Sequence, residues 1–149
     1  MSKKIVITGG LGYIGTELCK IYSGVSWNNT IIVIDNRFVS ERVNQIRNWN
    51  MEFVHGDILD KELIKKHCND ADVVHHLAGI TDVPRTKSES SEEKDNKIKA
   101  VAEEGTQNIL DAISDNCKII FPSTHVVYEG VEKVQNEISE NEEVKPILS

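Results

Sequence analysis

The sequence contains few cysteines and no long apolar run, and both features narrow the classes of protein that it can encode. Its three cysteines, Cys19, Cys68 and Cys117, are odd in number and far apart, so we expect neither a disulfide framework nor a zinc site built on Cys-x-x-Cys pairs. No apolar segment approaches the ~20 residues that a membrane-spanning helix needs. The apolar stretch that follows Lys4 is too short for a signal peptide. These absences predict a cytoplasmic protein without membrane contact.

Positive charge is scarce as well. The chain carries 17 Lys and Arg residues against 24 Asp and Glu residues, which gives a net charge of -7 at pH 7. This excess of negative charge repels phosphate backbones, so nucleic acid is not expected as a partner. His75, His76 and His125 have no further ligands at metal-binding spacing, and we predict no metal site. A small anionic ligand is still compatible with the sequence, because backbone dipoles can form a local binding pocket.

Short runs rich in Val and Ile alternate with longer amphipathic stretches along most of the chain. The expected strands are residues 4–8, 30–35, 51–55, 72–77 and 118–123, and the expected helices are residues 13–23, 41–48, 60–68 and 92–114. Strands that are apolar on both faces are typical of a parallel sheet. The alternation predicts an α/β fold, a Rossmann-type doubly wound parallel sheet of about five strands in the order 3-2-1-4-5.

The longest expected helix and the end of the chain differ in pattern. The helix carries apolar residues at helical spacing, namely Ile98, Val101, Ala102, Ile109, Leu110 and Ile113. This spacing predicts one buried helix face. Residues 129–149 contain six glutamates and two lysines with little periodicity. We therefore expect a dinucleotide-binding domain over residues 1–128 and an acidic surface segment over residues 129–149.

A glycine-rich turn joins the first expected strand to the first expected helix. Gly9, Gly12 and Gly15 recur at three-residue spacing directly after the apolar strand. In a dinucleotide site one glycine makes the tight turn, one lets the backbone approach the pyrophosphate, and one lets the helix pack on the strand. The N-terminus of the helix adds free N–H groups and a partial positive charge. The turn therefore predicts a phosphate-binding loop, and the absence of a Gly-Lys-Ser/Thr ending excludes a nucleoside-triphosphate P-loop.

An acidic residue follows this loop at the distance that a dinucleotide site requires. Asp35 ends the second expected strand twenty residues after Gly15, which is the spacing of a carboxylate that hydrogen-bonds the adenosine ribose. A carboxylate there repels a 2′-phosphate, so NAD is favoured over NADP, although an arginine such as Arg37 can accommodate that phosphate. The alternative interpretation is a structural turn in which Asp35 caps a loop.

Five segments resemble signature motifs of the NAD-dependent epimerase/dehydratase family, which belongs to the extended short-chain dehydrogenases/reductases. The segments are Thr8–Gly15 (TGGLGYIG), Gly56–Ile58 (GDI), His76–Gly79 (HLAG), Gly105–Leu110 (GTQNIL) and Phe121–Tyr128 (FPSTHVVY). They occur in the family's order and extend over nearly the whole chain. The family often has Asn where this chain has Ala102, which leaves the local cofactor contacts open.

The resemblance implies a role for each matching residue. The residues implied to bind NAD are Gly9, Gly12, Tyr13, Ile14, Gly15, Asp35, Asn36, Asp57, Ile58, Leu77, Ala78 and Gly79. In this interpretation the glycines hold the pyrophosphate and Asp35 holds the ribose. Thr124 matches the family's catalytic Ser/Thr, whose hydroxyl hydrogen-bonds the reacting oxygen of the substrate. Asp57 and Thr124 also have plainer interpretations, as a turn cap and as a strand-end hydroxyl.

The tyrosine and lysine on which the family's proton transfer depends are absent from the 149 residues. The family places them in a Tyr-x-x-x-Lys motif, in which the lysine helps to lower the pKa of the tyrosine. None of the three tyrosines, Tyr13, Tyr22 and Tyr128, has a lysine four residues later. We therefore expect a chain that stops before the catalytic helix and the substrate domain and that has no activity alone.

The resemblance thus predicts the NAD-binding portion of a nucleotide-sugar epimerase/dehydratase-like enzyme. Two alternatives stay open, a non-catalytic NAD-binding sensor or partner-recruiting module, and part of a related carbonyl or steroid-type reductase. In the expected strand order the fifth strand lies at an exposed edge, and such edges pair readily with other chains. We accordingly expect a homo-oligomer or a separate C-terminal partner chain.

Overall fold

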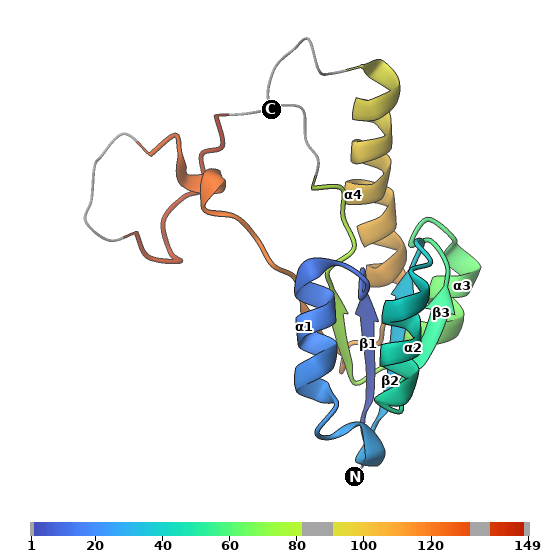
Figure 1. Cartoon of the computed structure of the whole chain (residues 1–149). Helices are drawn as coiled ribbons and strands as arrows, with labels where there is room; N and C mark the ends of the chain where they lie inside the picture. Colours follow the sequence, from blue (N-terminus) through green and yellow to red (C-terminus); the bar gives the residue numbers. More distant parts are fainter. Residues whose placement is uncertain (1, 82–90, 132–137, 148–149) are drawn as a thin grey trace.

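The computed structural model describes residues 2–81, 91–131 and 138–147. Strands and helices alternate along most of the chain (Figure 1). The order is β1 (Lys4–Thr8), α1 (Tyr13–Tyr22), the 3-10 helix η1 (Ser26–Asn28), β2 (Thr30–Asp35), α2 (Ser40–Asn48), β3 (Glu52–His55), α3 (Lys61–Cys68), β4 (Val73–His76), α4 (Glu92–Ala112), β5 (Lys118–Ile120) and the 3-10 helix η2 (His125–Tyr128).

The strands form one parallel sheet in the order β3-β2-β1-β4-β5. This confirms the predicted Rossmann-type α/β fold and its strand order. The register places Thr8, the last residue of β1, opposite Ile34 of β2 and His76 of β4. The carboxyl ends of the three central strands therefore meet at one edge of the sheet, which is where open α/β sheets bind ligands.

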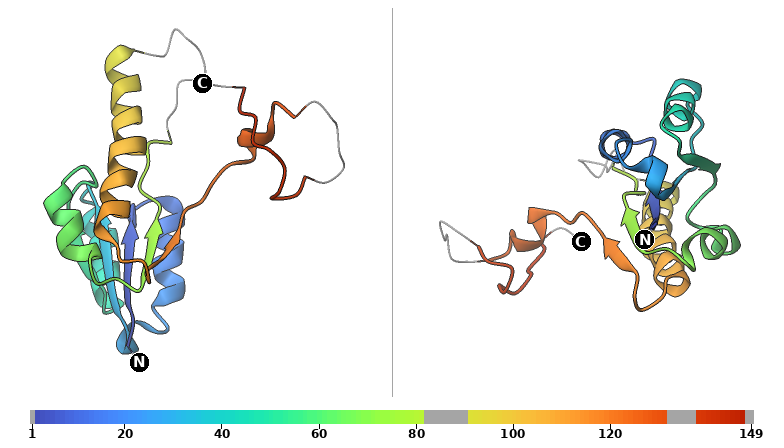
Figure 2. Two further views of the ribbon diagram at one scale, coloured as in Figure 1. Left: turned by 180° about the vertical axis from the view of Figure 1, so that it is seen from behind. Right: turned by 90° about the horizontal axis from the view of Figure 1, so that it is seen from below.

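Alternate residues of the central strands pack into two separate cores. Ile5 and Ile7 face α1 and α2, where Cys19 and Ile46 are buried against them. On the opposite face, residues such as Val6 pack against α3 and α4, and Figure 2 shows both helical layers from two further directions. Successive side chains of a strand point to opposite faces, so burial on both sides explains the nearly continuous apolar sequence of β1 and β2.

The two edge strands, β3 and β5, are less buried than the prediction of strands covered on both faces implies. In β3 and β5 the outer residues are exposed or half-buried, because each lies at an edge of the sheet. The fifth strand was expected to reach Ser123 but ends at Ile120. The pairing with β4 stops at Ile120, opposite His75, and Pro122, two residues later, has no backbone N–H to donate to a further ladder bond.

The buried face of α4 is also narrower than predicted. Its buried residues are Val101, Gly105 and Ile109, each one turn from the next. Ala102 and Leu110 are exposed, Leu110 to 47%. Each of these two residues follows a buried one and is rotated by about 100° away from it. The prediction was therefore wrong for Ala102 and Leu110, which point away from the sheet.

Beyond β5 the chain leads to η2, which stands apart from the sheet (Figures 1 and 2). A backbone hydrogen bond from Lys145 N to Val127 O at 2.7 Å joins η2 to the later chain, and Gly130, two residues after η2, donates from N to Lys145 O at 2.7 Å. The domain boundary after Tyr128 stays a prediction. Across residues 2–81, 91–131 and 138–147, no helix has both the length and the apolar composition needed to cross a membrane.

Candidate functional site

The glycine loop between β1 and α1 is closed so tightly that side chains are excluded at two positions. Gly9 adopts a φ of +69°, a left-handed conformation that residues with a side chain rarely adopt. A Cβ atom on Gly9 would lie 2.6 Å from Ala78 N, and one on Gly15 would lie 2.5 Å from Gly9 O. The loop thus touches both the end of β4 and the first turn of α1, as a backbone cradle for a phosphate requires.

The N-terminus of α1 is open toward this loop. Gly12 is the N-cap, no side chain caps the helix, and its first turn contains no acidic residue. The first N–H groups of an α-helix have no partner within the helix, so they and the helix dipole are available to an anion. Tyr13 and Ile14 are 87% and 61% exposed at this end of the helix.

Asp35 fixes the glycine loop from the end of β2. Its carboxylate is almost fully buried, and Oδ2 accepts a hydrogen bond from Leu11 N at 2.9 Å. Oδ1 accepts hydrogen bonds from Arg37 N at 2.9 Å and from Arg37 Nε at 3.3 Å. Asp35 therefore does cap a loop, as the alternative interpretation held. That contact places the carboxylate beside the helix N-terminus, where a ribose hydroxyl is expected.

The turn after β3 lies beside Asn36. Asn36 Nδ2 donates a hydrogen bond to Asp57 Oδ2 at 2.9 Å, and Asn36 O lies 3.0 Å from His55 Nε2. Asp57 Oδ1 accepts a hydrogen bond from Leu59 N at 3.0 Å. Asp57 thus caps its own turn while one oxygen contacts the residue that follows Asp35. The structure brings Asn36 and Asp57 together at the predicted adenine side of the loop.

Helix α4 packs against this turn and holds it in place. Ile58 is only 4% exposed, and a Cβ atom on Gly105 would clash with its side chain. Asn108 Nδ2 donates a hydrogen bond to Ile58 O at 3.0 Å. The GTQN segment of α4 thereby supports the GDI turn. Gly105 leaves room for the Ile58 side chain, and Asn108 hydrogen-bonds the Ile58 carbonyl. Ile58 can border a cofactor only through its backbone, because its side chain lies in the core.

A buried polar chain beneath the loop was missed by the sequence interpretation. Ala78 N donates to Thr8 Oγ1 at 3.3 Å, Thr8 Oγ1 lies 2.9 Å from His76 Nδ1, and His76 Nε2 lies 3.0 Å from Thr106 Oγ1. Burial lowers the pKa of His76, which favours the neutral ring. Each ring nitrogen of His76 faces a threonine hydroxyl, which can donate or accept, so the neutral ring is hydrogen-bonded at both nitrogens in either tautomer.

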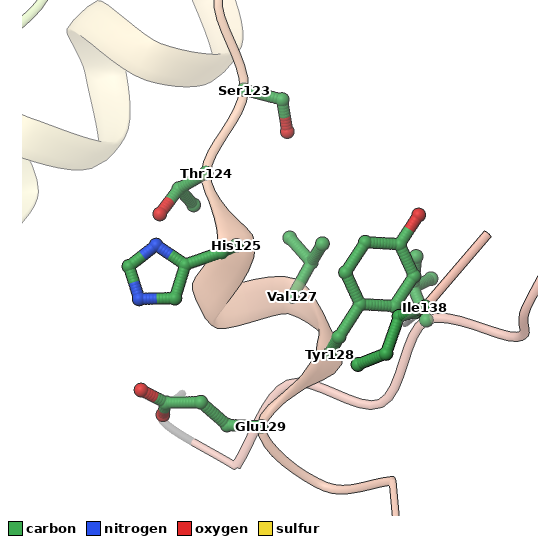
Figure 3. Close-up of a pocket in the computed structure, with 8 residues that line it drawn as sticks. Ser123, Thr124, His125, Val127, Tyr128, Glu129 and Ile138 are labelled. Carbon is green, nitrogen blue, oxygen red and sulfur yellow. The ribbon is translucent and has the colours of Figure 1, made fainter. Parts of the chain in front are cut away.

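Thr124 lies in a different place, at the start of η2. Its Oγ1 accepts a hydrogen bond from Val126 N at 3.3 Å. A cavity of about 720 Å³ lies here, and its lining residues are Ser123, Thr124, His125, Val127, Tyr128, Glu129, Ile138 and Val144. In Figure 3 the side chains of Thr124, His125 and Glu129 lie on one side of η2, opposite Tyr128 and Ile138. The described lining includes no residue of the glycine loop.

Comparison with known protein families identifies the group to which this arrangement belongs. The model of the 3-beta hydroxysteroid dehydrogenase/isomerase family matches residues 6–148. The chain belongs to this family. The resemblance to the NAD-dependent epimerase/dehydratase enzymes of the extended short-chain dehydrogenases/reductases is thereby confirmed.

Relatives of this family member include enzymes of nucleotide-sugar metabolism. The CDP-paratose 2-epimerase of Salmonella typhi is 35% identical over 142 residues, which cover 87% of this chain and 39% of that protein. Further curated relatives are a UDP-N-acetyl-alpha-D-glucosaminuronate decarboxylase from Bacillus cytotoxicus, which is 33% identical over 86% of this chain and 38% of that protein, and a dTDP-D-glucose 4,6-dehydratase from Dictyostelium discoideum, which is 31% identical over 99% and 36%. The chain thus spans about two-fifths of the length of the curated relatives it matches.

Solved structures agree in fold. The UDP-N-acetylglucosamine 4-epimerase from Methanobrevibacter ruminantium M1 has a TM-score of 0.74 at 26% identity, over 98% of this chain and 45% of that chain. The UDP-glucose-4-epimerase from Stenotrophomonas maltophila, solved with bound NAD, has a TM-score of 0.69 at 21% identity, over 96% and 43%. At the latter identity the likeness shows the fold alone.

In this member of the 3-beta hydroxysteroid dehydrogenase/isomerase family, the predicted site residues fall into two groups. The glycine loop, Asp35, Asn36, Asp57 and the backbone of Ala78 meet at the carboxyl edge of the sheet. Gly79 is exposed just beyond β4. Thr124 lies in the separate cavity at η2. The Thr8–His76 contact could have been found from the sequence, since the two residues end neighbouring parallel strands in the predicted order.

Proposed function

We propose that the chain binds NAD through the loop between β1 and α1, as the cofactor-binding portion of a nucleotide-sugar epimerase/dehydratase-like enzyme. The observation that carries the proposal is the backbone cradle at Gly9 and Gly15, which a Cβ atom would fill, with Asp35 hydrogen-bonded to Leu11 beside it. The same corner presents the uncapped N-terminus of α1. Backbone N–H groups, a helix dipole and a ribose acceptor fit the chemistry of a dinucleotide.

The roles of individual side chains follow from their positions. The N–H groups of α1 would bind the pyrophosphate, and the second lone pair of Asp35 Oδ2 would accept a ribose hydroxyl. Asn36 and Asp57 would border the adenine, and Leu77, Ala78 and Gly79 would border the middle of the cofactor. Bound NAD supplies a hydride acceptor and donor for carbon–oxygen chemistry.

The nucleotide-sugar assignment is supported by the relatives and by the cavity at η2. The curated relatives include an epimerase, a decarboxylase and a dehydratase that act on nucleotide sugars. Within the described residues the Thr124 hydroxyl accepts one hydrogen bond, from Val126 N, and Thr124 lines the cavity, so we propose that this hydroxyl donates to a substrate oxygen. The 149 residues contain no Tyr-x-x-x-Lys motif. We therefore propose that the chain binds cofactor and does not turn substrate over by itself. We also propose that it is located in the cytoplasm, as the resemblance to nucleotide-sugar enzymes suggests.

Calorimetric titration of the purified 149-residue chain with NAD tests this proposal. We expect saturable binding that Asp35→Ala weakens by about 10- to 100-fold, since a hydrogen bond to a charged group contributes about 1.5–3 kcal/mol. Asp115→Ala removes an equal charge from an exposed position in the loop before β5 and serves as the matched control. Circular dichroism verifies that each variant is folded. Absence of NAD binding by the folded wild-type chain would refute the assignment.

The family description itself favours a second candidate, part of a carbonyl or steroid-type reductase. Saturation-transfer NMR of the NAD-loaded chain with UDP-N-acetylglucosamine and with a hydroxysteroid separates the two candidates. Transfer to the nucleotide sugar, lost in Thr124→Val, supports the first candidate, and transfer to the steroid supports the second. NAD binding with transfer to neither molecule is the result expected both of the third interpretation, a non-catalytic sensor or partner-recruiting module, and of an enzyme portion whose substrate domain lies elsewhere.

A further inference from the structure

His76 lies between the glycine loop and the segment that carries Thr124. It is the last residue of β4, and its side chain is 2% exposed. Its Nδ1 lies 2.9 Å from Thr8 Oγ1, and its Nε2 lies 3.0 Å from Thr106 Oγ1. The ring also packs against the ring of Phe121, with the two centroids 5.5 Å apart. One imidazole therefore contacts the end of β1, α4 and the chain just after β5.

The contact with Thr8 links His76 to the glycine loop. Thr8 directly precedes Gly9, and its Oγ1 accepts a hydrogen bond from Ala78 N at 3.3 Å. A Cβ atom on Gly9 would lie 2.6 Å from the same Ala78 N. Close-packed groups transmit small displacements to their neighbours. A shift of Gly9 on ligand binding is therefore expected to move the hydroxyl that His76 contacts.

The contact with Phe121 links His76 to Thr124. The ladder between β4 and β5 ends one residue before His76 and Phe121, so their ring contact continues the link between the two strands. Pro122 comes next, and a proline fixes its own φ and restricts the residue before it to extended backbone. Thr124 lies only three residues after Phe121. This stiff segment carries the orientation that is set at Phe121 to the Thr124 hydroxyl.

We propose that His76 is a positioning residue that couples the glycine loop to Thr124, so that a bound nucleotide sets the orientation of the hydroxyl offered to the substrate. The inference rests on the proposed function, because it assumes a nucleotide at the loop. The buried His76 ring acts through its neighbours, Thr8 and Phe121. Coupling between two sites is carried by packed side chains and hydrogen bonds of this kind.

ADP tests this coupling, because it has the adenosine and diphosphate of NAD but lacks the nicotinamide riboside that would extend beyond the loop. Proton–nitrogen correlation NMR of the 149-residue chain follows two amides during the titration. The amide of Gly9 reports on the loop. The amide of Val126 reports on the hydroxyl, since it donates a hydrogen bond to Thr124 Oγ1 at 3.3 Å. We expect ADP to shift both resonances in the wild-type chain along the same saturation curve.

His76→Gln and Phe121→Leu each remove one ring of the contact, and both should keep the Gly9 shift and lose the Val126 shift. Phe121 is 59% exposed, so its replacement leaves the core intact. Phe121→Tyr keeps the ring and should keep both shifts. Trp27→Leu removes a 75% exposed ring from η1, before the start of β2. This matched control should also keep both shifts.

The outcomes distinguish the coupling from the proposed function beneath it. A Gly9 shift without a Val126 shift in the wild-type chain overturns the coupling and leaves nucleotide binding standing. A Val126 shift that persists in both His76→Gln and Phe121→Leu also overturns it, because the effect then reaches η2 by another route. A folded wild-type chain in which neither ADP nor NAD shifts the Gly9 amide overturns the proposed function and the inference together.

Discussion

Gly9 is a loop residue that packs directly against the backbone just after β4. Its φ is +69°, and a Cβ atom at this position would lie only 2.6 Å from Ala78 N, which leaves no room for a side chain. We expect Gly9→Ala to lower the free energy of unfolding by at least about 1–3 kcal/mol, the usual cost of a strained backbone position, and to abolish NAD binding. Urea unfolding followed by circular dichroism measures the first effect, and calorimetry measures the second.

Gly79→Ala is the matched control, since a Cβ atom on Gly79 meets nothing within 4 Å. Its free energy of unfolding should stay within about 0.5 kcal/mol of the wild-type value. Equal stability of the Gly9 and Gly79 variants would show that the loop can move away from β4.

Two buried histidines predict how stability depends on pH. Burial lowers the pKa of His75 and of His76, and Lys118 lowers that of His75 further. Histidine in an unfolded chain has a pKa of about 6.5, so below that pH the unfolded chain binds more protons than the folded one. The stabilisation is complete above about pH 6.5 and is lost as the pH falls toward the folded pKa values.

We therefore expect the melting temperature to fall between pH 7.5 and pH 5.5, as measured by circular dichroism. The fall should be smaller in His76→Gln, whose side chain does not titrate. The exposed His125 provides the control variant His125→Gln, which should follow the wild-type profile. Identical pH profiles for all three proteins would contradict a role for the buried ring.

At the scale of single elements, α4 offers neighbouring residues with opposite environments. Ile109 is fully buried and Leu110 is 47% exposed. Removing a buried branched side chain leaves a cavity, so Ile109→Ala should cost about 2–5 kcal/mol of unfolding free energy. Leu110→Ala should cost less than about 1 kcal/mol. Urea unfolding of both variants measures the difference, and equal costs would place the buried face of α4 elsewhere.

The element boundaries show what the sequence could and could not predict. The ranges of β1 and β2 were predicted to the residue, because runs such as Ile5–Ile7 are buried on both faces and end at a turn. The sequence also anticipated that Asp35 could cap the loop, as its hydrogen bond to Leu11 now shows. The binding of a ribose hydroxyl by Asp35 stays a prediction. Spacing alone did not reveal the early end of β5 or the exposure of Leu110, since both depend on which neighbours a residue has in the folded chain.

The polar contacts of the site were harder to predict for a related reason. Thr106 and Asn108 lie on a helix that is distant in sequence from His76 and Ile58, which they contact. A motif match indicated that this helix segment matters, but only the folded structure shows which backbone groups it holds. The separation of Thr124 from the glycine loop likewise depends on the path after Pro122, which carries no periodic pattern.

At the scale of the whole molecule, the described sheet ends at an open edge. Within the described residues β5 pairs with β4 alone, and Ile120 and Phe121 are 37% and 59% exposed there. Unpaired strand edges recruit further strands, so we expect the purified chain to self-associate, or to bind a separate partner chain. Light scattering should give a mass above the 16.7 kDa of one chain.

Ile120→Lys places a charge on this edge and should reduce the associated fraction. Ile21→Lys adds the same charge at a 75% exposed position on α1 and should have no comparable effect. A single species with the mass of one chain at all concentrations would contradict association through β5.

The central position of β1 also fixes when the cofactor loop can form during synthesis. β1 leaves the ribosome before β2 and β4, with which it pairs, and Gly9 packs against the backbone of Ala78. At roughly 5–20 residues per second, the stretch from Gly9 to Ala78 takes on the order of 4–15 s to translate. Strand β1 lacks its neighbour β4 through this interval and is open to chaperones. The glycine loop can therefore close against the sheet only after Ala78 has been translated.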